Sequence, residues 1–69
     1  MNIRKHDTLP AHLSNAHQWI SAAGEWDEAS KNPEEYSRAA FLNAVENEQF
    51  YIFEEDLLDV ISWHKRNNY

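Results

Sequence analysis

The apolar residues of segment 54–67, EEDLLDVISWHKRN, are spread too widely around a helix for one neighbour to cover them. Their spacing of three and four residues predicts an α-helix. They occupy an arc of more than half the circumference, which is typical of a helix that packs on more than one side. We therefore expect two other short helices, or a second copy of the chain, to cover it. The residues of this arc are Leu57, Leu58, Val60, Ile61, Trp63 and His64.

Charged residues mark both ends of this helix. Acids occupy positions 54–56 and basic residues occupy 64–66, which matches the electrostatic preference of a helix N-terminus and C-terminus. Each such end effect contributes only about 0.3–1 kcal/mol, but several agree here. The preceding segment 49–53, QFYIF, has aromatic and β-branched residues that favour an extended backbone. It contains neither glycine nor proline, so a helix that continues through it also stays open.

A second periodic pattern predicts a helix over residues 9–23. Thr8 or Asp7 can cap its start, and Pro10 is tolerated in the first helical turn. Gly24, the only glycine, stands where a helix C-cap is expected. The apolar stripe of this helix consists of Leu9, Leu13, Ala16, Ile20 and Ala23.

The sequence NPEE at 32–35 predicts the start of a third helix, over residues 33–47. Asn32 suits the cap, Pro33 suits the first helical position, and Glu35 can reach back to the cap. The segment 25–32 before it is expected to be a loop with room for one helical turn, pinned to the core by Trp26. The main apolar strip of the 33–47 helix is expected to be Phe41, Leu42 and Val45, with Tyr36 and Ala40 on another side.

Together these segments predict an all-α fold, a small three-helix bundle that forms one domain over residues 1–69. The chain has no cysteine, so disulfides cannot stabilise it. A domain of this size buries only about 60% of the surface of its unfolded chain, so dense helix packing or oligomerisation is needed. The consecutive side chains of residues 50–53 cannot all face one core, because neighbouring side chains point apart in a helix and in a strand. A homodimer would cover those that remain.

No pattern in the chain predicts a catalytic, cofactor or metal site. His12 and His17 are five residues apart, whereas paired ligands on a helix sit three or four apart. The acid clusters lack the glycine-containing ligand ladder of a calcium loop, and two of them stand at helix starts. There is no cysteine, no GxSxG sequence and no glycine-rich phosphate loop. We therefore expect a protein that is not an enzyme and that holds neither cofactor nor metal.

The negative charge is concentrated in the middle of the chain. The whole sequence carries −6, but residues 25–59 contain eleven acids against Lys31 and Arg38, a sum of −9. An acidic surface repels nucleic acid and attracts the basic surfaces of other proteins. Direct binding of nucleic acid is therefore not expected. Mimicry of DNA phosphates by the carboxylates is an alternative, although solubility alone also explains such a surface.

These properties favour a non-enzymatic protein that docks onto a larger macromolecule as an adaptor, regulator or inhibitor. They suit the accessory proteins that phages and mobile elements encode against host machinery. The alternatives are a helical DNA-binding regulator and a structural subunit that assembles with itself. The longest apolar runs, AAFL and FYIF, are four residues long and cannot span a membrane, so we expect a cytoplasmic protein.

Acids and exposed aromatic residues are the candidates for binding the partner. Acids would steer the protein to a basic surface, and tryptophan and tyrosine are favoured anchors in protein interfaces. The tryptophans also fit a second interpretation, in which they complete the core. The residues expected to bind the partner are Glu54, Glu55, Asp56, Asp59, Tyr51, Trp63 and Trp26.

Overall fold

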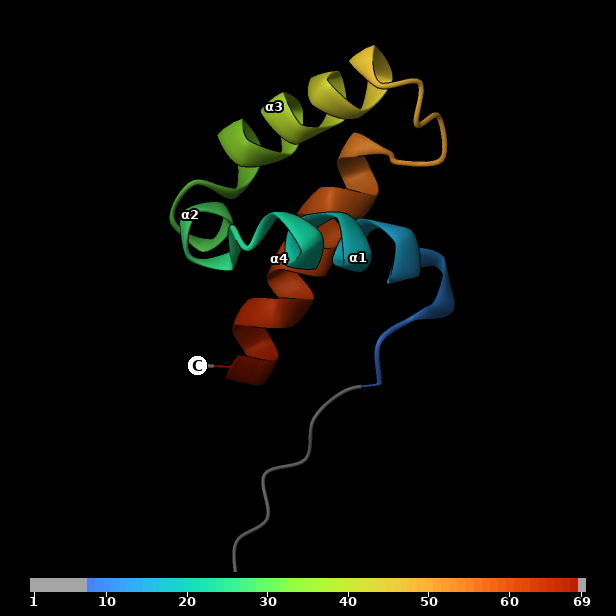
Figure 1. The fold of residues 1–69 in the computed structure, drawn as a ribbon. Coiled ribbons are helices and arrows are strands. Elements are labelled where there is room, and N and C mark those ends of the chain that lie inside the picture. Colours follow the sequence, from blue (N-terminus) through green and yellow to red (C-terminus); the bar gives the residue numbers. More distant parts are fainter. Residues whose placement is uncertain (1–7, 69) are drawn as a thin grey trace, which may run out of the picture.

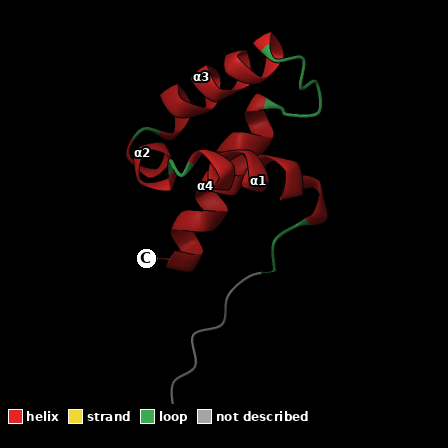
Figure 2. Cartoon of the chain, viewed as in Figure 1, coloured by secondary structure: helices red, strands yellow, loops and turns green. Residues whose placement is uncertain are grey.

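The structure is a computed structural model that describes residues 8–68 (Figures 1 and 2). This part of the chain is mostly helical, with four α-helices and no strand. The predicted all-α fold is therefore confirmed, but its helix count is one too low. The elements are the 3-10 helix η1 (Ala11–Leu13) and the α-helices α1 (Ser14–Ala23), α2 (Trp26–Lys31), α3 (Pro33–Glu46) and α4 (Glu54–Asn68).

Helix α4 is the central element of the fold. It packs against η1, α1, α2 and α3, and in Figure 1 it passes behind α1 and below α3. Helices α1 and α3 do not pack extensively on each other. The broad apolar arc predicted for segment 54–67 is thus covered by helices of the same chain. A homodimer is not needed to cover α4, and it stays a prediction.

The core lies around α4 and is built from small and aliphatic side chains. Leu57, Val60 and Ile61 are fully buried, as the sequence predicted. Leu58, Trp63 and His64 on the flanks of the arc are half-buried. The other buried apolar residues are Leu13, Ala16 and Ile20 from η1 and α1, Ala29 from α2, Ala40 and Ala44 from α3, and Ile52 from the α3–α4 loop.

The first helical segment begins later than predicted and ends where predicted. Pro10 has an extended ψ of 139°, and the Leu13 amide donates to its carbonyl oxygen over 3.0 Å to form η1. No side chain caps this start; Thr8 does not, and Asp7 lies outside the described residues. At the other end Gly24 adopts a left-handed φ of +67°, which is the expected glycine cap. The prediction that Ala23 lies on the buried stripe is wrong, because its side chain is exposed.

Helix α3 turns a different face to the core from the one predicted. Leu42 and Val45 are 55% and 39% exposed, whereas Ser37, Ala40 and Ala44 are buried and Phe41 is half-buried. The large side chains of α4 fill the space between the two helices, so α3 can approach closely only with small residues. The predicted Asn32 side-chain cap is also wrong, because no side-chain hydrogen bond forms there.

The connection between α3 and α4 is an irregular loop. Segment 49–53 is therefore not part of a continuous helix, which the sequence had left open. The backbone leaves α3 in a Schellman motif: the Gln49 amide donates to Ala44 over 2.8 Å, and the Glu48 amide donates to Val45 over 2.9 Å. Glu48 takes the left-handed position of this motif, with a φ of +59°. Turns then lead through Ile52, which is buried, to the first residue of α4.

Candidate partner-binding surfaces

The predicted aromatic surface exists in the α3–α4 loop. Phe50, Tyr51 and Phe53 are 66%, 52% and 50% exposed, and Ile52 between them is buried. The buried isoleucine anchors the loop and leaves its three neighbours in solvent. The expectation that these consecutive residues cannot share one core is confirmed.

The predicted acidic residues follow this loop at the start of α4. Glu55 and Asp59 are exposed, whereas Glu54 and Asp56 are half-buried. The first turn of α4 therefore presents carboxylates that begin three residues after Tyr51 in the sequence. Whether they bind a partner stays a prediction.

Trp26 and Trp63 lie apart from this loop, in a cluster of aromatic rings. The Trp26 ring stacks on His64 with centroids 4.1 Å apart and planes at 14°. The His17 ring lies 5.1 Å from Trp26 and 5.6 Å from Trp63. The Trp26 indole N–H also donates to Ser21 Oγ over 3.1 Å. Both tryptophans thus join α1, α2 and α4 to one another, which favours their interpretation as core residues.

The surroundings of His64 in this ring cluster shift its pKa. Burial lowers the pKa of His64, and a positive charge on His17 would lower it further. The Asp27 carboxylate on α2 acts in the opposite direction. The neutral imidazole is the form that stacks on Trp26 without a desolvation cost.

A groove runs between α1 and α3, which flank it without packing extensively on each other. Its volume is about 530 Å³, within the size range of ligand-binding clefts. Small and aromatic side chains line most of it, and carboxylates stand at the end where α1 passes into α2. The lining residues are Trp19, Ala22, Ala23, Glu25, Glu28, Tyr36, Ala39, Ala40 and Asn43.

The acidic end of the groove is organised by Tyr36. Its hydroxyl donates to Glu25 Oε1 over 2.8 Å. Burial raises the pKa of the Tyr36 hydroxyl, and this hydrogen bond and the negative charges of Glu25 and Glu28 raise it further. The Tyr36 hydroxyl, which is protonated at neutral pH, thus holds Glu25 at the mouth of the groove.

The groove was not among the sequence predictions. The sequence does contain two pairs of small residues that point to such a groove, Ala22–Ala23 and Ala39–Ala40. Small residues on two helices leave space where these helices face each other. The sequence does not say that these pairs face each other, because that depends on how both helices lie on α4.

No protein-family model matches the chain, and neither a curated protein nor a solved structure matches it. Over residues 8–68, none of the helices combines the length and the apolar character needed to cross a membrane.

Proposed function

We propose that this protein is a non-enzymatic adaptor, regulator or inhibitor that binds a basic segment of a larger protein in the α1–α3 groove. The observation that carries the proposal is the groove itself, with an apolar lining that ends at two carboxylates. We expect this binding to take place in the cytoplasm.

The chemistry of the groove defines the segment that fits it. The alanines of α1 and α3 leave room for a large apolar side chain of a partner, and Trp19 offers it an aromatic surface. Glu25 and Glu28 would bind a lysine or arginine that follows this side chain in the partner. The occupant is therefore a segment in which an apolar residue stands beside a basic one.

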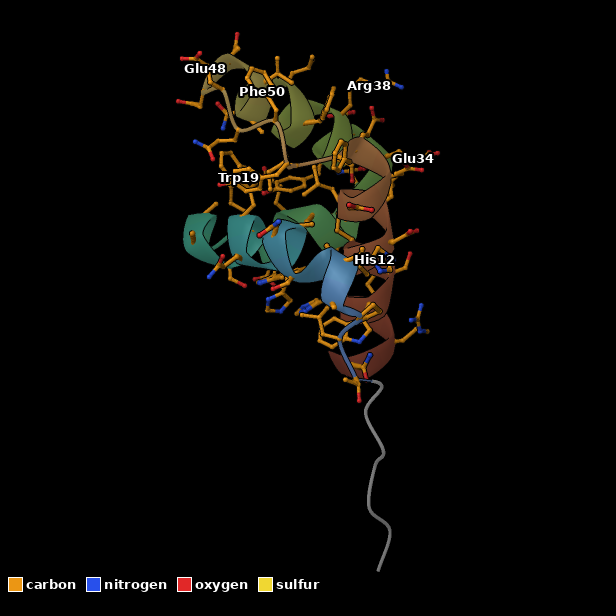
Figure 3. All side chains as sticks on the ribbon, turned by 90° about the vertical axis from the view of Figure 1, so that its right-hand side faces the viewer. His12, Trp19, Glu34, Arg38, Glu48 and Phe50 are labelled. Atoms are coloured by element: carbon orange, nitrogen blue, oxygen red, sulfur yellow. The ribbon has the colours of Figure 1, made fainter. Side chains whose placement is uncertain are left out.

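The rest of the surface supports such a partner. The charge of −9 over residues 25–59 would speed the approach of a basic protein. In Figure 3, Trp19, Glu48 and Phe50 lie on the same side of the molecule, whereas Glu34 and Arg38 lie on the other. Phe50 is exposed in the loop that follows α3, the helix that forms one wall of the groove, and we propose it as a further contact. Basic segments of this kind are common in proteins that bind nucleic acid. An acidic protein would compete with DNA for binding to such a segment.

The proposal can be tested by NMR with a defined probe. A short peptide with leucines flanked by lysines is titrated into the labelled full chain, and a peptide with glutamates in place of the lysines is the control. The lysine peptide should shift the Trp19 indole signal and the amides of Ala22, Ala39 and Asn43. The glutamate peptide should not, because Glu25 and Glu28 repel it.

A matched pair of variants separates the groove from general attraction. Ala39→Leu fills the groove from an exposed position of α3 and should weaken binding of the lysine peptide at least about tenfold, a loss of about 1.4 kcal/mol. Ser62→Leu adds the same side chain at an exposed position of α4 outside the groove and should leave binding unchanged. Unchanged binding in Ala39→Leu, or shifts centred on Glu54 and Glu55, would refute the groove as the site.

Self-association is a second use of the exposed loop. Phe50, Tyr51 and Phe53 form an apolar surface that burial in a dimer would remove from water. Light scattering over a concentration series tests this. A dimer that dissociates in a variant with serine at positions 50, 51 and 53 would assign the loop to self-assembly and leave the groove for the partner.

A further inference from the structure

Three side chains that can bind a metal ion meet where η1 packs on α4. A ring nitrogen of His12 and carboxylate oxygens of Asp56 and Asp59 all lie within 4.8 Å of one another. Figure 3 shows His12 beside α4. The next residue, Leu13, is buried and fixes η1 on α4, so the imidazole is held over this helix.

The electrostatics of this group favour a cation. Asp56 and Asp59 are three residues apart on α4 and therefore share a face, where their negative charges repel each other. Asp56 is half-buried, which weakens the screening of this repulsion by solvent. Among residues 8–68, the side chains of His12, Asp56 and Asp59 make no hydrogen bond or ion pair. A positive ion between the three side chains would relieve the repulsion and occupy all three.

We propose that His12, Asp56 and Asp59 bind one divalent transition-metal ion, with Zn²⁺ as the type case. An imidazole nitrogen with two carboxylate oxygens suits Zn²⁺, Ni²⁺ or Cu²⁺, whereas Mg²⁺ and Ca²⁺ prefer oxygen alone. Bonds of about 2.0–2.2 Å place the ligand atoms of a tetrahedral site about 3.3 Å apart. The ligand atoms can reach this spacing by rotation of their side chains. The side chains of His12 and Asp59 are exposed and therefore free to rotate. Three protein ligands leave the fourth position to water.

The site would tie η1 to α4. Because the metal binds the folded arrangement and not the unfolded chain, it raises the melting temperature of the protein. The site shares no residue with the α1–α3 groove, so this proposal and the proposed function can fail independently.

Calorimetric titration of the full chain with ZnCl₂, after removal of any affinity tag, tests the site. We expect one ion to bind per chain. His12→Gln and Asp59→Asn should each weaken binding of the ion by at least about tenfold. Loss of a group that merely orients a metal ligand already costs about that much, and these residues are proposed as ligands themselves. His17→Gln and Glu55→Gln are the matched controls, one histidine and one acid outside the group, and should bind as the unchanged chain does.

Two further measurements make the result specific. Zn²⁺ should raise the melting temperature of the unchanged chain but not of His12→Gln, and it should shift the ring signals of His12 but not those of His17 and His64. Failure of Zn²⁺ to bind, equal affinity for Mg²⁺ and Zn²⁺, or full binding by His12→Gln would each overturn the proposal. Equal loss in His17→Gln would also overturn it, since the ligands would then be different.

Discussion

At the scale of single residues, Glu48 shows how a helix end can be built without glycine. Helices α1 and α3 both end in a Schellman motif, with Gly24 and Glu48 in the left-handed position. A side chain in this conformation costs about 1–2 kcal/mol, whereas glycine adopts it freely. Nothing in the sequence marks Glu48 as the residue that turns the chain, so only the structure reveals this strain.

Glu48→Gly should therefore stabilise the protein. We expect the gain in free energy of unfolding to be about 0.5–1 kcal/mol, because relief of strain exceeds the added entropy of glycine in the unfolded chain. Urea unfolding followed by circular dichroism measures it. Ala39→Gly, at an exposed position inside the same helix, should instead lose about 1 kcal/mol. A loss of stability in Glu48→Gly would contradict the strain.

Ser37 is a second residue with a local cost. Its side chain is fully buried between α3 and the core, and its hydroxyl oxygen has no hydrogen-bond partner within the described structure. A buried polar group without a partner costs about 1–3 kcal/mol. Ser37→Ala removes this cost with almost no change in volume, so we expect it to stabilise the protein by about 1 kcal/mol.

The same urea experiment tests Ser37→Ala, with Ser62→Ala as the control. Ser62 is exposed on α4, so its hydroxyl is hydrated and the substitution should change stability by less than about 0.5 kcal/mol. If Ser37→Ala were less stable than the unchanged chain, its hydroxyl would have to make a hydrogen bond in solution.

At the scale of elements, the ends of the helices were easier to predict than their faces. The acids at 54–56, Pro33 and Gly24 act on the backbone within a few residues, so the bounds of α3 and α4 and the end of α1 came out within one residue or so. The buried face of α3 depends on what lies opposite. Counting large apolar residues therefore selected Leu42 and Val45, whereas the contact with α4 requires Ala40 and Ala44.

The candidate sites also differ in how far they could be predicted from the sequence. Four consecutive apolar and aromatic residues at 50–53 indicated that one core cannot take them all, which is a local property, and the structure shows that Tyr51 is one of those left exposed. The groove needs Ala22 and Ala39 to face each other, and the metal group needs His12 to meet Asp59. Both depend on segments far apart in the sequence, and no spacing along the chain encodes their approach.

The ring cluster that joins α1, α2 and α4 should make stability depend on pH. The pKa of His64 is lowered in the folded protein, so below its ordinary value of 6.5 the unfolded chain binds protons more readily. The contribution of His64 to stability is therefore complete above about pH 6.5 and is lost as the pH falls through the lowered value. We expect the melting temperature to fall as the pH is lowered from about 7.5 through the ordinary histidine pKa of about 6.5, where this loss begins.

A variant can assign this pH dependence to one ring. His64→Gln removes the titrating group that stacks on Trp26, so the fall in melting temperature between the same pH values should become smaller. An undiminished fall in His64→Gln would show that this ring is not its source.

At the scale of the whole molecule, α4 holds the fold together because every other helix packs on it. Leu57 is fully buried in this helix. Leu57→Ala should cost about 2–5 kcal/mol, which approaches the whole stability of a small domain. We expect circular dichroism to show loss of helix in all segments together, whereas Leu42→Ala on the exposed side of α3 should change stability by less than about 0.5 kcal/mol. Independent melting of α3 after Leu57→Ala would contradict this central role.

The position of α4 in the chain also bears on how the protein is made. A ribosome synthesises η1, α1, α2 and α3 before α4, and all four of these elements pack on α4. Helices this short are marginal in water on their own. We therefore expect these elements to stay largely unstructured until α4 has left the ribosomal exit tunnel, with their apolar segments open to chaperones and proteases until then.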